Sequence, residues 1–344
     1  MMLLDYSKDE LIEYIVKLGY PKFRGSQLFD ALMQGKKLDE ITNLPKDLLQ
    51  KVKDEYPNFE IFRCLESKDG TKKYVYKLND GQIIEGVFMK YKYGNTLCVS
   101  TQVGCRMGCK FCASGLHGLI RNLSAGEILE QIIIVNRDNG GDLKHRQVTN
   151  VVLMGSGEPL DNYENVTKFF KLVNSEDGIN ISQRNISLST CGIVPNIYKL
   201  ADDGYSITLT ISLHASNDEI RRKTMPIANK YSIFEILDAC KYYFDKTGRR
   251  IIFEYTLVAG VNDSIKCAEE LSKILKGFSC HVNVIPLNYV KERNLKGSPV
   301  TLAHKFAEIL IEKGLSATVR RTLGADIGGA CGQLRNQILE EANF

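Results

Sequence analysis

Residues 105–112 read Cys105-Arg106-Met107-Gly108-Cys109-Lys110-Phe111-Cys112 and place three thiols in the spacing C-x3-C-x2-C. The chain has ten cysteines in 344 residues, for which this spacing would arise by chance about 0.01 times. Three thiolates on one tight loop can bind three corners of a [4Fe–4S] cluster, which normally takes four cysteines. Because no fourth cysteine follows nearby, one iron would stay open to another ligand.

A structural zinc site is the alternative interpretation of this segment. His117 follows Cys112 by five residues and would complete a Cys3His ligand set. Structural zinc usually takes its ligands from two separated pairs, whereas these three cysteines lie within eight residues. The spacing therefore favours a cluster bound by Cys105, Cys109 and Cys112.

From residue 97 onward, strand-like apolar segments alternate with helical segments. The expected strands are 97–100, 151–154, 186–189, 207–213, 251–257, 282–285 and 317–320. A helix is expected at 125–136, after the capping box Ser124-x-x-Glu127. Repeated β–α units predict an α/β fold with a parallel sheet covered by helices, and six or seven units favour a partial or complete barrel over an open doubly wound sheet. Active residues would then follow the C-terminal ends of the strands.

The first 96 residues have a different pattern. Residues 1–58 predict a small helical accessory domain, which opens with the capping box Ser7-x-x-Glu10. Residues 59–96 predict a β-hairpin extension or linker, because Asp69-Gly70 marks a turn beside alternating apolar residues. Residues 97–344 would then form the main domain, with a C-terminal loop around Cys331.

The composition is that of a globular protein with a sizeable core. Hydrophobic residues make up 44% and charged residues 25%, which excludes collagen-like and disordered classes. The longest apolar runs fall far short of the ~18 residues that span a bilayer, and no signal peptide is visible. We therefore expect a cytoplasmic protein with reduced thiols. Scattered cysteines are expected to be small buried residues; these are Cys64, Cys240, Cys267 and Cys280.

The net charge is +4 at pH 7, but the charges are unevenly distributed. Residues 61–124 hold ten Lys or Arg and four Asp or Glu. Such a basic zone fits a polyanionic partner, and a solvated strand face explains it equally well.

A glycine-rich segment, Gly155-Ser156-Gly157-Glu158-Pro159, directly follows the expected strand at 151–154. An ordinary turn would explain this segment about as well when it is taken alone. Gly157 would allow close approach of the backbone, and Glu158 places a carboxylate at the strand end. Further candidate residues fall at the ends of later strands; these are Ser189, Ser212, Leu213, His214 and Asn288.

The cysteine motif, with Phe111 before its third cysteine, resembles the signature of the radical S-adenosylmethionine (SAM) superfamily. Gly157-Glu158-Pro159 resembles the Gly-Glu-Pro motif of that superfamily. The resemblance implies a partial (β/α)6 barrel, a [4Fe–4S] cluster on the three cysteines, and SAM bound to the open iron and cleaved to a 5′-deoxyadenosyl radical. The implied cofactor-binding residues are Gly157, Glu158, Ser189, Ser212, Leu213, His214 and Asn288.

Four longer segments resemble the adenosine C2 methyltransferases of 23S ribosomal RNA and certain transfer RNAs. They are 96–105, 154–160, 212–215 and 330–334, and the resemblance extends over nearly the whole chain. It implies that Cys331 accepts a methyl group from one SAM, and that the deoxyadenosyl radical then removes a hydrogen from this methyl group. The carbon radical adds to C2 of adenine. Glu85 accepts the C2 proton, and Cys98 resolves the covalent RNA adduct through a transient disulfide with Cys331.

The resemblance also implies 23S rRNA and tRNA substrates and an external flavodoxin-like one-electron reductant. We expect a monomer that does not associate with a membrane. We expect RNA contacts from the basic zone at 61–124 and from five further cations, Arg221, Arg222, Lys223, Arg249 and Arg250. The thiol of Cys331 should be accessible and partly deprotonated. Three arginines are near enough in sequence to lower its pKa; these are Arg320, Arg321 and Arg335.

Besides a more distant radical enzyme that does not methylate, two alternatives stay open at the level of sequence. The first is the closely similar adenosine C8 methyltransferase associated with antibiotic resistance, but Gly157-Glu158-Pro159-Leu160 favours the C2 group, because the C8 group resembles Gly-Glu-Ala-Leu there. The second is a non-catalytic RNA-binding protein with a structural zinc site. One departure from the C2 family is Cys191, where serine is commoner.

Overall fold

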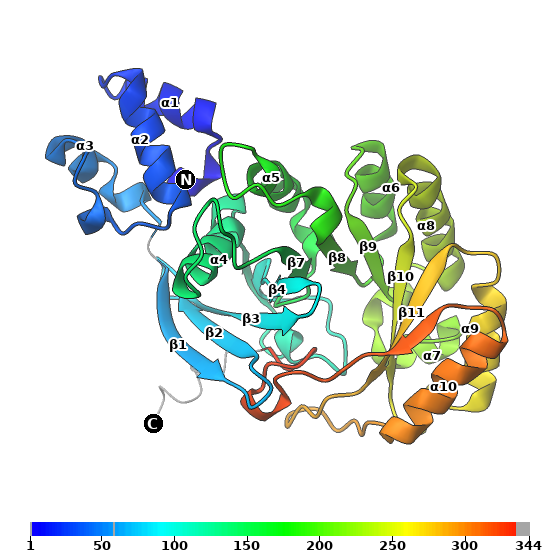
Figure 1. Cartoon of the computed structure of the whole chain (residues 1–344). Coiled ribbons are helices and arrows are strands. Elements are labelled where there is room, and N and C mark those ends of the chain that lie inside the picture. Colours follow the sequence, from blue (N-terminus) through cyan, green and yellow to red (C-terminus); the bar gives the residue numbers. More distant parts are fainter. Residues whose placement is uncertain (1, 58, 335–344) are drawn as a thin grey trace.

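The computed structural model of the chain describes residues 2–57 and 59–334. Its central feature is a curved sheet of ten strands in the order β1-β2-β3-β4-β7-β8-β9-β10-β11-β12 (Figure 1). The strands are β1 Glu60–Glu66, β2 Lys72–Lys77, β3 Ile83–Tyr91, β4 Gly94–Cys98, β7 Asn150–Leu153, β8 Ile186–Thr190, β9 Thr208–Ser212, β10 Ile251–Leu257, β11 Cys280–Pro286 and β12 Ala317–Val319. Two short strands, β5 Gln102–Gly104 and β6 Leu119–Asn122, form a separate antiparallel pair.

Within the ten-stranded sheet, β4 and the strands from β7 to β12 run parallel to one another and form the barrel. The connecting helices are α4 Ala125–Asp138, α5 Tyr163–Asn174, α6 Val194–Asp202, α7 Asp218–Thr224, α8 Ile233–Thr247, α9 Ile265–Ile274 and α10 Val300–Glu312. Six crossovers followed by the three-residue strand β12 make a partial (β/α)6 barrel, with the helices on its outer face (Figure 1). The expected partial barrel is therefore confirmed, and each of the seven expected strands overlaps an observed one.

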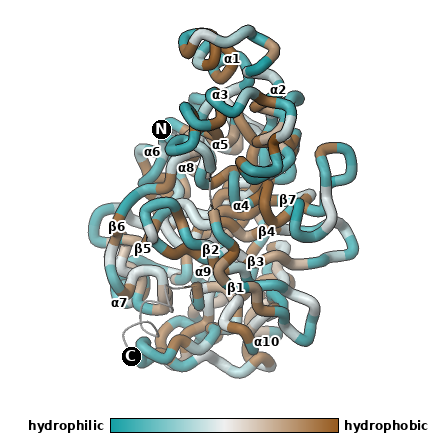
Figure 2. The backbone as a smooth tube through the Cα atoms, turned by 90° about the vertical axis from the view of Figure 1, so that its left-hand side faces the viewer, coloured by the Kyte–Doolittle hydropathy of each residue, from teal (hydrophilic) through white to brown (hydrophobic). Residues whose placement is uncertain are grey.

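Three further helices lie together at one end of the molecule (Figures 1 and 2). They are α1 Lys8–Lys17, α2 Lys22–Met33 and α3 Lys46–Lys51. The expected capping box is present, since the Ser7 hydroxyl accepts a hydrogen bond from the N–H of Glu10. Leu11, Ile15 and Leu28 are fully buried and join the same apolar core as the barrel. Three short helices bury little apolar surface by themselves, so they depend on this packing against the barrel for their stability.

The strands β1, β2 and β3 form an antiparallel meander that continues the barrel sheet, because β3 pairs antiparallel with β4. The alternating tyrosines Tyr74 and Tyr76 are completely buried, so the side of the meander on which they lie is part of the core. The segment at 59–96 is therefore hydrogen-bonded into the same sheet as the barrel strands and is not a detached linker. Within the described residues, no helix is long and apolar enough to cross a membrane.

Candidate active site

The three-cysteine loop begins at the end of β5 and crosses to β6. The backbone N–H of Cys105 donates to the carbonyl of Gly118 at 2.9 Å. Gly104 has φ +76°, and a Cβ there would lie 2.0 Å from the Gly118 carbonyl oxygen. Any larger residue would therefore push the loop off the strand pair, so a glycine is required where the loop starts.

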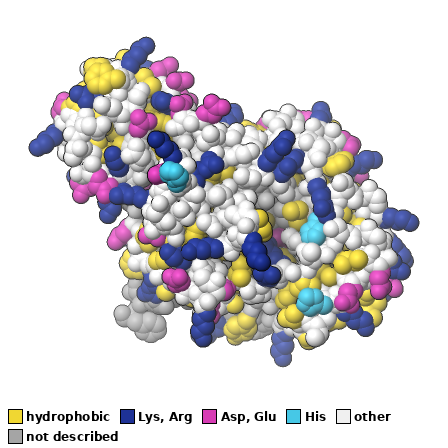
Figure 3. All heavy atoms as spheres, viewed as in Figure 1, with side chains coloured by type: hydrophobic (Ala, Val, Ile, Leu, Met, Phe, Trp, Pro, Cys, Tyr) yellow, Lys and Arg dark blue, Asp and Glu magenta, His cyan; other side chains and the backbone are white. Residues whose placement is uncertain are grey.

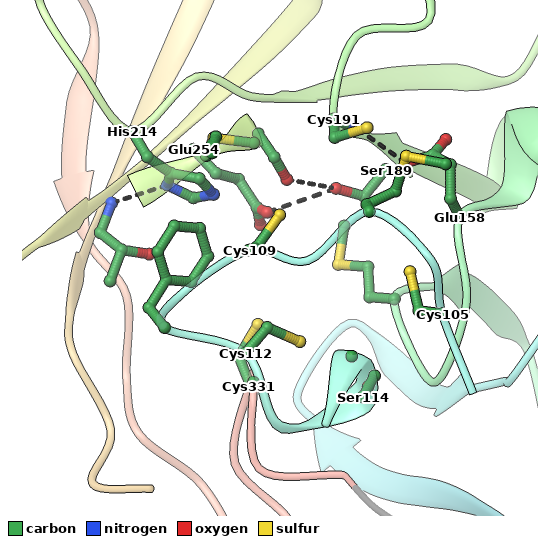
Figure 4. Close-up of a pocket in the computed structure, with 18 of the residues that line it drawn as sticks. Cys105, Cys109, Cys112, Ser114, Glu158, Ser189, Cys191, His214, Glu254 and Cys331 are labelled. Carbon is green, nitrogen blue, oxygen red and sulfur yellow. Dashed lines mark hydrogen bonds between the residues drawn. The ribbon is translucent and has the colours of Figure 1, made fainter. Parts of the chain in front are cut away.

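The loop closes a pocket at the C-terminal ends of the barrel strands, and the side chains of its three cysteines point into that pocket (Figure 4). Most of the expected site residues line it; these are Cys105, Cys109, Cys112, Gly157, Glu158, Ser189, Ser212, His214, Asn288 and Cys331. Glu85, Cys98 and Leu213 do not. Leu213 is fully buried, and its carbonyl accepts from Nε of Arg221. Its role as a cofactor contact stays a prediction.

Within the described residues, no group of three His, Cys, Asp or Glu side chains is arranged to hold a single metal ion. The three thiols of a cubane cluster each bind a different iron, so they surround a cage and do not converge on one point. His117 lines a separate small cavity together with Glu85, not the cysteine pocket. The structure therefore does not bring His117 together with the cysteines as the Cys3His alternative requires.

Burial raises the pKa of two thiols of the cluster loop, to about 12 for Cys105 and further for Cys109. Thiols in such surroundings lose their protons only when a cationic group binds them. Arg221 acts in the opposite direction on Cys109, because its positive charge lowers the pKa of that thiol. Cys105 and Cys109 are thus buried thiols that fit a strongly cationic iron centre.

Arg221 itself is completely buried, so the expectation that it contacts RNA is wrong. Its Nη2 donates to the Cys191 carbonyl at 2.6 Å, and its Nη1 has no hydrogen-bond partner among the described residues. A buried cation beside thiols would stabilise their ionised forms. The run Arg221-Arg222-Lys223 looks like a solvated basic face in the sequence, but α7 turns its first arginine inward.

Glu158 is held at the end of β7 by backbone donors. Its Oε2 accepts from the N–H of Cys191 at 2.8 Å, and its Oε1 accepts from the N–H of Leu160 at 3.1 Å. Burial raises its pKa, and these hydrogen bonds act against that rise. The preceding Gly157 has φ +112°, and a Cβ there would meet Gln102 at 2.7 Å. The carboxylate is therefore fixed in the pocket, with lone pairs left for a bound cation.

His214 is a buried neutral histidine that presents one ring nitrogen to the pocket. Its Nδ1 accepts a hydrogen bond from the N–H of Thr256 at 2.9 Å, so Nε2 carries the ring proton. Its ring packs edge-on against Phe111 of the cysteine loop at 4.7 Å. Burial, aided by the charge of Arg221, lowers its pKa to about 3. His214 is therefore a hydrogen-bond donor throughout the neutral pH range.

The neutral state of His214 predicts a specific acid sensitivity. The folded pKa of about 3 lies below the ordinary value of 6.5, so this stabilisation is complete above pH 6.5 and is lost as the pH falls. The slope from this one group is up to ~1.4 kcal/mol per pH unit. Denaturant unfolding between pH 7 and 4 should show a smaller loss of stability for His214→Gln, whose amide oxygen keeps the acceptor. If the wild type and His214→Gln lose the same free energy of unfolding between pH 7 and 4, this prediction is wrong.

Glu254 in the middle of β10 was not anticipated. Its Oε1 accepts from Nη1 of Arg320 at 2.6 Å, and its Oε2 accepts from the Ser189 hydroxyl at 3.4 Å (Figure 4). Its carbonyl accepts the backbone N–H groups of Leu213 and His214. A charged residue inside an otherwise apolar strand was the signal that could have revealed it. Glu254 thus joins three strand ends of the site.

The C-terminal loop that carries Cys331 is anchored on two sides. The N–H of Ala113 donates to the Gly332 carbonyl at 2.8 Å, and this contact places Cys331 beside the cysteine loop. On the other side, the Asp69 carboxylate accepts from the N–H of Gly324 at 2.9 Å. Asn288 donates to the Cys331 carbonyl at 2.9 Å. Segments that lie far apart in sequence therefore hold this exposed thiol at the pocket (Figure 4).

Cys98 lies on β4, and it is buried with Val87, Met89 and Leu334. Burial, with a contribution from the charge of Cys331, raises its pKa to about 12. Both thiols are free, and the disulfide between them stays a prediction. Cys331 is exposed as a whole residue, but the protein around its sulfur removes water from the thiol and raises its pKa to about 11.

The expectation of a partly deprotonated Cys331 is therefore not met in the protein alone. Arg320 is the arginine whose charge lowers the pKa of this thiol, but it does not outweigh the effect of burial. Arg335 lies outside the described residues.

Glu85 forms a buried ion pair in the meander. Its Oε1 lies 2.7 Å from Nζ of Lys73, and the two side chains are 3% and 1% exposed. Lys73 also donates to the carbonyl of Gly328, in the loop that leads to Cys331. The ammonium group thus connects the carboxylate with this loop.

Two other basic residues lie away from the cofactor pocket. Arg249 and Arg250 precede β10, at the opposite end of the barrel, and their expected contact with RNA stays a prediction. Among the scattered cysteines, Cys240, Cys267 and Cys280 are buried as expected, whereas Cys64 is exposed on β1.

Comparison with known proteins decides the family. Residues 99–271 match the family model described as "Radical SAM superfamily". A "Probable dual-specificity RNA methyltransferase RlmN" of Lachnospira eligens is 52% identical over 97% of this chain and 95% of its own length. A relative with the same name from Clostridioides difficile is 51% identical over 98% of both chains. The chain belongs to the RlmN family.

A solved structure supports the same conclusion. The "radical SAM methyltransferase from Sphaerobacter thermophilus" is 41% identical, with a TM-score of 0.93 over 98% of this chain and 99% of that one. The structure of "Streptococcus suis SuiB bound to S-adenosylmethionine" is 15% identical, with a TM-score of 0.50 over 66% of this chain and 50% of that one, and shares the fold alone. RlmN membership thus rests on the whole length of the chain, N-terminal helices included.

Proposed function

We propose that this RlmN-family protein is a radical SAM RNA methyltransferase that methylates C2 of adenosine in 23S rRNA and in certain tRNAs. The observation that carries the proposal is the anchoring of Cys331 beside the three-cysteine loop, by the hydrogen bond between Ala113 and Gly332. A methyl carrier must sit next to the source of the radical, and an exposed cysteine at that place supplies one. The names of the full-length relatives support the same activity.

The described residues fit both implied cofactors. Cys105, Cys109 and Cys112 offer three thiols around one side of the pocket, and Arg221 provides a buried positive charge close to them. When bound, the cluster and SAM together supply a 5′-deoxyadenosyl radical. Glu158 offers carboxylate lone pairs to the methionyl ammonium group, and His214 donates a hydrogen bond from Nε2. Ser189, Ser212 and Asn288 line the remaining wall.

The chain's own groups then carry the methyl group and the proton. Electron-poor C2 of adenine cannot attack a sulfonium methyl, so the Cys331 sulfur accepts the methyl group first and delivers it as a carbon radical. Glu85 accepts the proton that leaves C2 of the covalent adduct. The sulfur of Cys98 then attacks the sulfur of Cys331 and forms a disulfide with it. The S–CH2 bond to the RNA breaks in this step, and its electron pair stays with the carbon, which takes a proton and becomes the methyl group. These roles follow the family resemblance.

Substitution of the cluster cysteines tests the proposal. We expect single Cys105→Ala, Cys109→Ala and Cys112→Ala variants, reconstituted anaerobically, to lose most of their iron and all RNA methylation. With only two thiol ligands, a second iron of the cluster would lack a protein ligand. Iron and sulfide content are measured first, and then 2-methyladenosine in RNA by mass spectrometry. Cys64→Ala, at an exposed thiol outside the site, should keep both.

The same measurements separate the alternatives. 8-Methyladenosine in place of 2-methyladenosine would assign the chain to the C8 group. A colourless protein with stoichiometric zinc, and no methylated product, would support a non-catalytic RNA-binding protein. An external one-electron reductant, a monomeric state and a cytoplasmic location belong to the same proposal.

A further inference from the structure

A second, larger cavity opens at the other end of the barrel lumen. It has a volume of about 650 Å³, and residues near the starts of the parallel strands line it, among them Asn150, Ser187, Ile252 and Thr318. We call this cavity the basal groove. Figure 3 shows a hollow in the middle of this face of the molecule, with Lys and Arg side chains around it.

The basal groove is strongly basic. Five cations line it, and no acidic side chain does so among the described residues; the cations are Lys90, Lys92, Arg184, Arg320 and Arg321. Arg320 is neutralised by Glu254, whereas no ion pair is found for the other four within the described part of the chain. A concave surface with uncompensated positive charge attracts polyanions.

Aromatic rings accompany these charges. Tyr91 and Tyr93 stack with their ring centroids 5.0 Å apart and their planes within 10°. Tyr93 is 75% exposed, so its outer face is open to a further ring. At the base of the groove, the buried hydroxyl of Thr210 has no hydrogen-bond partner among the described residues. Stacked aromatics beside backbone-neutralising cations are the features with which proteins bind single-stranded nucleic acid.

The basal groove is connected with the catalytic thiol. A small cavity between them shares Met89, Tyr91, Arg320 and Arg321 with the groove. This cavity is also lined by Asn288 and Cys331, which belong to the cofactor pocket. Polar and aromatic groups therefore line the protein between the groove and the methyl carrier. A base that leaves its stack in the groove would reach the buried reacting centre past these residues.

We propose that the basal groove binds the single-stranded RNA segment next to the target adenosine, with one base stacked on Tyr93 and the phosphates on Lys90, Lys92, Arg184 and Arg321. This rests on the proposed function and adds the entry route of its substrate. Of the basic zone expected at 61–124, only Lys90 and Lys92 line this route. The cations Arg222 and Lys223 on α7 represent the competing route, on the side of the cofactor pocket.

The test measures binding of an in vitro transcribed hairpin RNA, with adenosines in its loop, to the anaerobically reconstituted holoenzyme. Tyr93→Ala should weaken binding about tenfold, and Tyr93→Phe should restore it, because stacking needs the ring and not the hydroxyl. The double variant Lys90→Gln/Lys92→Gln should lower the slope of log Kd against log salt by about 1.4. The matched control is Arg222→Gln/Lys223→Gln, which should bind as the wild type does.

Reductive cleavage of SAM to 5′-deoxyadenosine is recorded for every variant, and it should be unchanged in the groove variants. If the wild type binds and methylates the RNA but the groove variants bind equally well, the groove proposal is overturned and the proposed function stands. The groove proposal is also overturned if Arg222→Gln/Lys223→Gln loses more RNA affinity than the groove variants do. If polyglutamate displaces the RNA as efficiently as unlabelled RNA does, the groove is a general anion site, and the proposal that it binds RNA specifically is overturned. A wild type that binds no RNA overturns both proposals.

Discussion

Cys331→Ser abolishes RNA methylation while the holoenzyme keeps its iron and still cleaves SAM. This is the expected result, because the hydroxyl of serine is a far weaker nucleophile than a thiol at neutral pH and cannot accept the first methyl group. Loss of an obligatory covalent carrier should reduce turnover by on the order of 10³-fold or more. Product formation is measured as 2-methyladenosine by mass spectrometry, with 5′-deoxyadenosine as the second readout.

The control for this variant is Cys64→Ser. Cys64 and Cys331 are both exposed free thiols, but Cys64 lies on β1 and does not line the cofactor pocket. It should methylate RNA at the wild-type rate. Intact protein mass adds a direct check, since the wild type incubated with SAM should gain one methyl group on the peptide that contains Cys331. Turnover by Cys331→Ser within a few-fold of the wild type would remove the carrier role.

Much of the site could be predicted because parallel strands bring their C-terminal ends to one edge. Residues at or after the ends of four different strands were predicted to meet, and Glu158, Ser189, Ser212, His214 and Asn288 do line one pocket. The alternation of side chains along a strand could have separated Leu213 from its neighbours in the sequence. Side chains alternate along a strand, so a residue between Ser212 and His214 points to the opposite face.

Other features depend on tertiary contacts that local sequence does not encode. Arg221 stands in a run of three cations and looks solvated, yet it is buried beneath the cysteine loop. The raised pKa of Cys331 likewise comes from burial by segments distant in the chain. Lys73 lies in a basic stretch, and only the pairing of β2 with β3 places it diagonally across from Glu85. Charge runs therefore give the net charge of a region but not which members reach water.

The second large effect is expected at Lys73, where Lys73→Met should destabilise the fold by about 3–5 kcal/mol. Lys73 and Glu85 are almost completely buried and 2.7 Å apart, so removal of the ammonium group leaves a buried carboxylate without its cation. The variant also loses the hydrogen bond to the Gly328 carbonyl. Denaturation in urea under anaerobic conditions should show a midpoint lowered by on the order of 1 M.

Two further variants identify the cause of this loss. Lys77→Met removes an exposed lysine from the same strand, and it should leave the midpoint within experimental error. Lys73→Met/Glu85→Gln removes both charges and should recover much of the lost stability, because the cost lies in burying the carboxylate charge without the Lys73 ammonium group and not in the lost attraction. If the double variant is as unstable as Lys73→Met, the contact with the Cys331 loop, and not the ion pair, is what Lys73 contributes to the fold.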